Sequence, residues 1–291
     1  MKTRIAMEQM FITLGQQCNS NCAHCQCGGS RDVFMSRETM KRIFDEVAGV
    51  GNLYLAGGES QMPGWIDACN ELAGVIKECG ADVDHFRTHT NASVCDENWQ
   101  RALVQLENQC SQKRNKCMYF ISNDRFHKRA IPKLVGEKTY ENNIEHLKKS
   151  RFFNGIAAYC DEFIIAQGRA TGKKFLDGVP ALDPKLLQCT TYPIALTNET
   201  DGARSMYVNA LCFGVSGDVI VDSDFTTQVE NALGNVHDAN IFDIVTSHPQ
   251  TRMCHDANGF FKTVNVNADE NDRLIQLGIA QRRFEMQESH K

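Results

Sequence analysis

The residues best suited to chemistry in this sequence lie in one short loop that carries several cysteines. Cys18, Cys22 and Cys25 follow an apolar stretch with C-x3-C-x2-C spacing, and Cys27 comes two residues later. Three thiolates this close together can each bind one iron of a 4Fe–4S cluster and leave the fourth iron open. A zinc knuckle that closes with Cys27 or His24 is the alternative. The spacing favours the cluster, because Cys27 is too near Cys25 to point inward with it easily.

A second motif, Gly57-Gly58-Glu59, ends the strand predicted at residues 52–56. Glycines allow backbone carbonyls to approach a ligand closely, and a carboxylate can bind an amine. The motif is weak evidence by itself. It gains weight here because it ends the strand that follows the cysteine loop.

The two motifs together resemble those of the radical S-adenosylmethionine (SAM) superfamily, whose cysteine loop follows the first strand of a partial barrel. By this resemblance Cys18, Cys22 and Cys25 bind the cluster, and its open iron binds the amino and carboxylate groups of SAM. His24 stands at the aromatic position of the loop, and Ser60 replaces the usual proline after Gly-Gly-Glu. The resemblance implies that SAM is cleaved reductively to a 5′-deoxyadenosyl radical, which abstracts a hydrogen atom from the substrate.

Further residues resemble cofactor-binding positions of the same superfamily. Thr90 and Asn91 end the strand predicted at 83–90, and Ser122 and Asp124 follow the strand at 118–122, where members often contact the ribose of SAM. Gly168-Arg169-Ala170 resembles a segment of members that carry C-terminal clusters. Each segment also fits an ordinary polar turn, so both interpretations stay open at this point.

The elements that must position these residues alternate between strands and helices. Strands are predicted at 10–14, 52–56, 83–90, 118–122 and 163–165, with amphipathic helices between them. Such repeats predict a parallel sheet covered by helices. With the resemblance, the expected fold is an α/β partial (β/α)6 barrel over residues 1–175. A small α+β lobe is expected over 176–291, with a hairpin around Ser216-Gly217-Asp218 and helices at 241–245 and 269–284.

The C-terminal region loosely resembles the SPASM and twitch extensions, which bind auxiliary iron–sulfur clusters. Cys189 and Cys212 are the candidate ligands there, although Asp222 stands where a further cysteine is expected. Cys254 is a candidate catalytic residue, because a thiol can donate a hydrogen atom to a carbon radical. A cluster ligand and an idle thiol are the alternative interpretations of Cys254.

These observations predict a radical SAM enzyme that epimerises or isomerises a polar small molecule, such as an aminosugar, or a peptide residue. An electron donor such as flavodoxin or ferredoxin would reduce its cluster. Oxidation with an auxiliary cluster and modification of a nucleoside are alternatives. A non-catalytic metal-binding module is disfavoured, because it would leave Gly57-Gly58-Glu59 without a purpose.

Composition narrows the class of protein further. The chain has 291 residues, 42% of them hydrophobic, and a net charge of −5, with Lys and Arg scattered among acids. This pattern does not favour duplex nucleic acid as a partner. The thirteen cysteines are an odd number and indicate metal ligands in a reducing compartment rather than a disulfide scaffold. No apolar run reaches membrane-spanning length, so a cytoplasmic location is expected.

Overall fold

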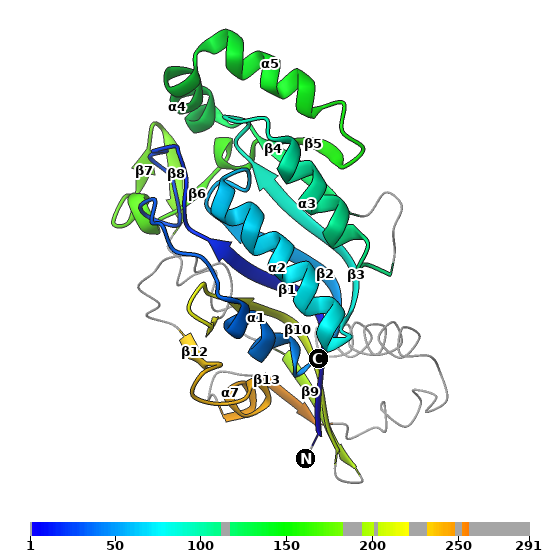
Figure 1. Ribbon diagram of the computed structural model, residues 1–291. Coiled ribbons are helices and arrows are strands. Elements are labelled where there is room, and N and C mark those ends of the chain that lie inside the picture. Colours follow the sequence, from blue (N-terminus) through cyan, green and yellow to red (C-terminus); the bar gives the residue numbers. More distant parts are fainter. Residues whose placement is uncertain are drawn as a thin grey trace.

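The computed structural model describes residues 2–111, 117–182, 194–200, 203–220, 232–247 and 252–255. Its main feature is a ten-stranded sheet with the order β12-β11-β10-β1-β2-β3-β4-β5, to which β9 and β13 attach beyond β10 (Figure 1). The strands of this sheet are β1 (Lys2–Gly15), β2 (Val47–Gly57), β3 (Asp82–Thr90), β4 (Met118–Ser122), β5 (Phe153–Ala157), β9 (Ile194–Thr200), β10 (Ala203–Phe213), β11 (Asp218–Ile220), β12 (Ala232–Asn235) and β13 (Arg252–His255). A small second sheet contains β6 (Ile164–Ile165), β7 (Phe175–Leu176) and β8 (Val179–Leu182).

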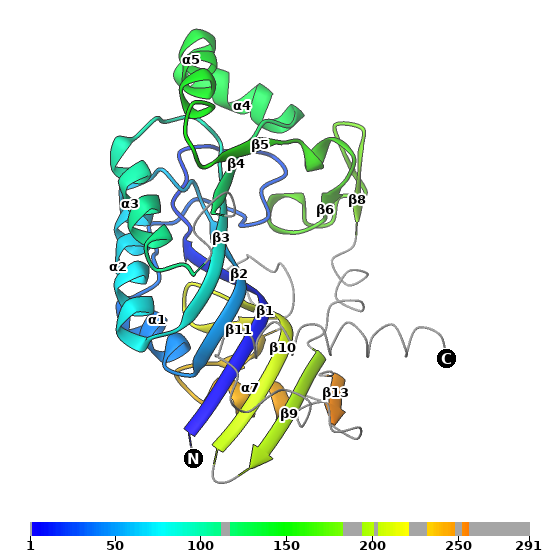
Figure 2. The same cartoon turned by 90° about the vertical axis from the view of Figure 1, so that its right-hand side faces the viewer.

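Three helices, α1 (Arg37–Phe44), α2 (Pro63–Cys79) and α3 (Glu97–Glu107), cover one face of the main sheet (Figure 2). Their apolar stripes bury Trp65 and Trp99 against strand residues such as Phe86. Ser36 caps the first of these helices, as predicted, by accepting a hydrogen bond from the Thr39 amide at 3.1 Å. The helices of the described residues are α1 (Arg37–Phe44), α2 (Pro63–Cys79), α3 (Glu97–Glu107), α4 (Arg125–Val135), α5 (Glu137–Leu147), α7 (Ile241–Ser247) and the 3-10 turns η1 (Tyr159–Asp161) and η2 (Gly168–Ala170).

The strands from β1 to β5 are parallel, and β10 continues the parallel set on the other side of β1. This confirms the predicted α/β class with a parallel sheet. Parallel strands place all their carboxyl ends at one edge, where ligands collect in sheets of this kind. The cysteine loop follows β1, so it lies at that edge.

The fifth strand of the parallel sheet is not the predicted one. The segment predicted at 163–165 forms β6 in the small second sheet, whereas β5 (Phe153–Ala157) pairs with β4. The sequence Phe-Asn-Gly-Ile-Ala contains Asn and Gly, which are depleted in strands, so propensity alone misses it. Pairing with β4 in the folded chain overrides that preference.

The described part of the C-terminal region extends the main sheet. The predicted hairpin is confirmed, since β10 and β11 pair antiparallel with Cys212 opposite Ile220, and α7 confirms the predicted helix at 241–245. The helix predicted at 269–284 lies outside the described residues. Closure of a (β/α)6 barrel and a domain boundary near residue 175 stay predictions. None of the helices in the described ranges is long and apolar enough to cross a membrane.

Candidate functional site

A cavity of about 290 Å³ opens at the carboxyl edge of the parallel strands. The candidate residues that line it come from four separate places in the sequence. All the predicted cluster and SAM ligands of the first 125 residues are among them: Cys18, Cys22, His24, Cys25, Gly57, Gly58, Glu59, Thr90, Asn91, Ser122 and Asp124. The fold therefore brings these residues together around one space.

Gly57 and Gly58 fix the position of the cysteine loop by close backbone contact. The amide of Gly58 donates to the Gly15 carbonyl at 2.8 Å, and the amide of Glu59 donates to the Gln17 carbonyl at 2.9 Å. A Cβ atom at Gly57 would lie 1.9 Å from the Gly15 carbonyl oxygen, and one at Gly58 would lie 1.9 Å from that of Gln17. Gly57 also has φ of +125°, a backbone conformation that favours glycine. The paired glycines are thus required by the packing of two backbone segments.

Glu59 is buried at 2% exposure, and its carboxylate is engaged by the protein itself. One oxygen accepts hydrogen bonds from the Thr90 hydroxyl at 2.5 Å and the Gln61 amide at 3.1 Å, and the other from the Asn91 amide at 2.7 Å. Burial raises the pKa of Glu59, and these hydrogen bonds oppose the rise. Glu59 therefore joins the ends of β2 and β3, a role that sequence reasoning had not assigned to it.

The thiols of the cysteine loop are strongly perturbed. Burial raises the pKa of Cys18 to about 12 and also raises that of Cys22, whereas a hydrogen bond with Cys27 is the main cause that lowers the pKa of Cys25 to about 6. Buried thiols that resist ionisation become stable thiolates when metal cations supply positive charge. The donor set of Cys18, Cys22 and Cys25 on one cavity therefore fits the 4Fe–4S cluster that the motif predicts.

Three residues that line this cavity carry a buried polar atom with no hydrogen-bond partner among the described residues. These atoms are Gln16 Oε1, Ser60 Oγ and His24 Nδ1, in side chains that are 3%, 1% and 8% exposed. Buried polar groups are nearly always hydrogen-bonded in native proteins. Their presence around one cavity therefore indicates a polar ligand, as SAM would be.

Gly168 and Arg169 hold the cysteine loop from the outside. The Arg169 amide donates to the Cys25 carbonyl at 3.0 Å, and its guanidinium donates to the Cys22 carbonyl at 3.3 Å. Gly168 has φ of +58°, and a Cβ there would lie 2.3 Å from the Gln26 carbonyl oxygen. The segment that sequence reasoning could not separate from a simple turn is thus a direct support of the loop.

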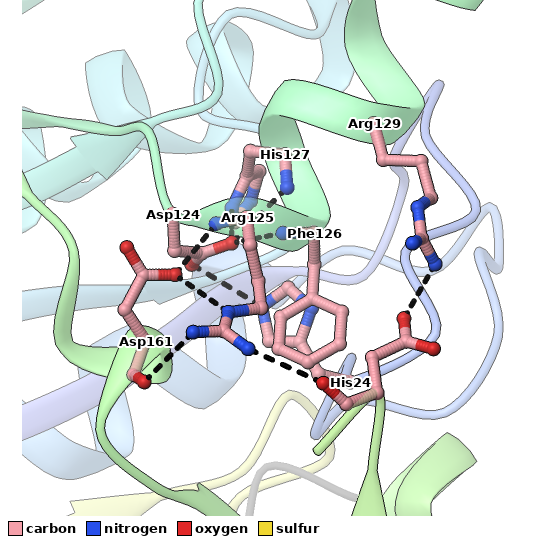
Figure 3. Close-up of polar contacts among 8 residues, drawn as sticks. His24, Asp124, Arg125, Phe126, His127, Arg129 and Asp161 are labelled. Atoms are coloured by element: carbon pink, nitrogen blue, oxygen red, sulfur yellow. Dashed lines mark hydrogen bonds and ion pairs between the residues drawn. The ribbon is translucent and has the colours of Figure 1, made fainter. Parts of the chain in front are cut away.

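His24 and Asp124 lie next to each other at the start of α4 (Figure 3). Asp124 caps α4 by accepting from the amides of Phe126 and His127 at 3.0 and 3.1 Å, and it pairs with His127 Nδ1 at 2.9 Å. Burial would raise the pKa of Asp124, but His127 and then His24 lower it to about 2. His24 Nε2 lies 3.6 Å from Asp124, and its ring stacks on Phe126 with centroids 4.4 Å apart. His24 is therefore directed toward Asp124, which weakens the zinc-knuckle alternative that uses it.

The cavity also contains residues outside the motifs predicted to bind the cluster and SAM. Tyr54 and His89 lie near the ends of β2 and β3, and Cys160 lies in η1 after β5. Burial lowers the pKa of His89 to about 4, so its ring is neutral at physiological pH. The available signal was strand alternation, because Tyr54 and His89 occupy positions between the core-facing residues of their strands.

Two of the C-terminal candidate cysteines, Cys212 and Cys254, lie in described strands of the main sheet. Cys189 lies outside the described residues, and Cys212 is buried in β10 opposite Phe11. Cys254 in β13 pairs with Leu196 in β9, and Leu196 is opposite Tyr207 in β10, which pairs with Ala6 in β1. Along the strand direction, Cys254 is therefore level with Ala6. That level is about nine residues before the end of β1, or about 30 Å at the usual rise per strand residue. The auxiliary cluster and the donor role of Cys254 both stay predictions.

Comparison with known proteins places this geometry in context. No protein-family model and no curated protein sequence matches the chain. Among solved structures it is similar to anSMEcpe with bound S-adenosylmethionine and the Cp18Cys peptide, at 14% identity over 82% of this chain and 79% of that one, with a TM-score of 0.51. SuiB of Streptococcus suis bound to S-adenosylmethionine matches at 10% identity over 90% and 69% of the two chains, with a TM-score of 0.39.

The likeness to anSMEcpe shows that this chain shares the fold of that protein. From the sequence, the cysteine loop and Gly57-Gly58-Glu59 predict the radical SAM superfamily.

Proposed function

We propose that this protein is a radical SAM enzyme that binds a 4Fe–4S cluster through Cys18, Cys22 and Cys25 and binds SAM in the same cavity. The observation that carries the proposal is the convergence of these thiols with the ends of β2, β3 and β4 on one cavity. A zinc knuckle would need no such cavity and no paired glycines against the loop.

The cofactors supply the difficult chemistry, since a reduced cluster and bound SAM generate a carbon radical that removes a hydrogen atom from the substrate. The protein holds them in place. Gly57 and Gly58 bring backbone next to the thiols, while Gln16 and Ser60 offer polar atoms to SAM. Arg169 adds a positive charge that lowers the pKa of Cys25 and favours its thiolate. A one-electron donor of the flavodoxin or ferredoxin class would reduce the cluster.

We infer that the substrate is a peptide residue or a polar small molecule, and that the net reaction is an epimerisation or isomerisation. A peptide is supported by the Cp18Cys peptide seen with anSMEcpe, which shares this fold. The half-buried rings of Tyr54 and His89 would give such a substrate an uncharged aromatic surface beside the cofactor.

Anaerobic reconstitution with iron and sulfide tests the proposal. The protein should bind about four irons per chain at the cysteine loop. With dithionite and SAM it should release 5′-deoxyadenosine. Cys22→Ala should abolish both iron binding and SAM cleavage. Cys79→Ala is the matched control, because that thiol lies at the end of α2, far from the loop in the sequence, and it should retain both. A protein that binds one zinc, gains no brown colour and does not cleave SAM would exclude the proposed function.

A further inference from the structure

One thiol reaches the cavity from outside the cysteine loop. Among the residues that line the cavity, Cys18, Cys22, Cys25 and Cys27 belong to the loop, and Cys160 comes from η1. The lining also includes Gln16, Ser60 and His24, each of which carries a buried polar atom with no hydrogen-bond partner among the described residues. Cys160 is thus a free thiol on the wall of a cavity built to hold a ligand.

The surroundings of Cys160 keep its proton in place. Burial and then the neighbouring Asp124, which accepts a hydrogen bond from the thiol, raise the pKa of Cys160 to about 12. Because the pKa of Asp124 is held at about 2, the acceptor is a carboxylate at physiological pH. The sulfur therefore carries a hydrogen atom under working conditions.

We propose that Cys160 is the hydrogen-atom donor of this cavity, an inference that rests on the proposed radical SAM function. An S–H bond is weaker than the C–H bond that forms when a carbon radical takes its hydrogen. The carbon radical gains a C–H bond, the S–H bond of Cys160 breaks, and a thiyl radical remains on sulfur. One electron from the low-potential donor and one proton from solvent then restore the thiol.

The two other candidate thiols are less suited to this step. The Cys27 thiol donates to the Gly57 carbonyl at 3.5 Å and shares a hydrogen bond with Cys25. Its hydrogen is therefore engaged in hydrogen bonds beside the proposed cluster ligands. The register of β13 places Cys254 near the opposite end of β1. Cys160 alone, among the described cysteines, lines the cavity without belonging to the loop.

Turnover in D2O without any substrate tests the proposal with known reagents. Thiols exchange their hydrogen with solvent, whereas the carbon-bound hydrogens of the protein do not. When only SAM and dithionite are supplied, the wild-type enzyme should transfer deuterium from Cys160 into the methyl group of 5′-deoxyadenosine. Mass spectrometry of that product measures the deuterium content, independently of how much product forms. Cys160→Ser should lose most of the deuterium, because a hydroxyl bond is too strong to donate.

Controls separate this inference from the proposed function. Cys79→Ala should keep the wild-type deuterium content. It is a matched control because Cys79 is also half-buried and its thiol donates a hydrogen bond to Asp45 at 3.3 Å. Burial and Asp45 raise the pKa of Cys79 to about 11. Cys160→Ala serves if the serine variant fails to fold or to bind iron. Unchanged deuterium in the Cys160 variants, or loss of deuterium in Cys254→Ala instead, would overturn the donor role. Deuterium-free product from wild type would also overturn it, with the proposed function intact. Absence of 5′-deoxyadenosine would overturn both.

Discussion

Two walls of the cavity differ in how their polar groups are satisfied. The closed wall consists of Gly57, Gly58, Glu59, Thr90 and Asn91, where both carboxylate oxygens of Glu59 and the Gly58 amide are hydrogen-bonded to other protein groups. The open wall consists of His24, Asp124, His127 and Cys160. There the His24–Asp124 contact is 3.6 Å long and His24 Nδ1 has no hydrogen-bond partner among the described residues.

This difference indicates that the two walls have different roles. The closed wall is fixed by backbone contacts and by a buried carboxylate, so it can hold the cysteine loop in place before any ligand binds. The open wall contains His24 and Asp124, whose pKa values are lowered, and Cys160, a thiol that lies outside the cysteine loop. Spare hydrogen-bonding capacity on that side can be used by ligand or substrate.

Gly58→Ala would damage the closed wall most. The added Cβ would lie 1.9 Å from the Gln17 carbonyl oxygen, so one of two backbone segments must move. Overpacking of this kind costs about 3 kcal/mol. We expect that loss in the free energy of unfolding by urea titration, together with loss of iron binding. Gly29→Ala in the same loop has nothing within 4 Å of its Cβ and should be nearly neutral in stability. If Gly58→Ala and Gly29→Ala were equally stable, the close backbone contact between Gly58 and Gln17 would not be what requires glycine at position 58.

Glu59→Gln should have the next largest effect on this wall. An amide cannot accept on both sides, so one of the donors from Thr90, Gln61 or Asn91 loses its acceptor, at a cost of about 2 kcal/mol. Because burial raises the folded pKa of Glu59 above 4.5, its protonation stabilises the folded state below that pH. The advantage of wild type over the variant should therefore shrink as pH rises from 4.5.

Urea titrations of both proteins between pH 4 and 8 would measure this advantage. Glu71→Gln, at an exposed ion pair with Arg37, is the control and should show little change. A wild-type advantage that grows with pH would contradict the sign of the shift.

His127→Ala tests the open wall and should have the smallest effect. His127 helps to hold the pKa of Asp124 at about 2, below its ordinary 3.8. Asp124 therefore stabilises the folded protein above pH 3.8, and this contribution is lost as pH falls through 2. Without His127 we expect a loss of about 1 kcal/mol at pH 7 that fades toward pH 2, measured by denaturant titration. His146→Ala, an exposed histidine of α5, should show no such pH dependence.

The fold and the site could be predicted unequally from the sequence. The strands β1 to β4 were predicted because they are apolar and separated by amphipathic helices. The polar residues at their ends then had to meet at one edge of the sheet. Strand β5 was missed because Asn154 and Gly155 disfavour a strand until β4 pairs with it. The role of Gly168-Arg169 was undecided because a glycine in a turn and a glycine against another backbone look the same in a sequence.

By itself, the sequence determined the cysteine loop, the Gly57-Gly58-Glu59 motif and the kind of sheet that carries them, because these depend on local spacing and on alternation along the chain. Only the tertiary structure decided which distant thiol lies at the cavity, placing Cys160 there and Cys254 level with the start of β1. The physical reason is strand register. A cysteine's chemistry depends on what faces it, and pairing between strands far apart in the chain determines that.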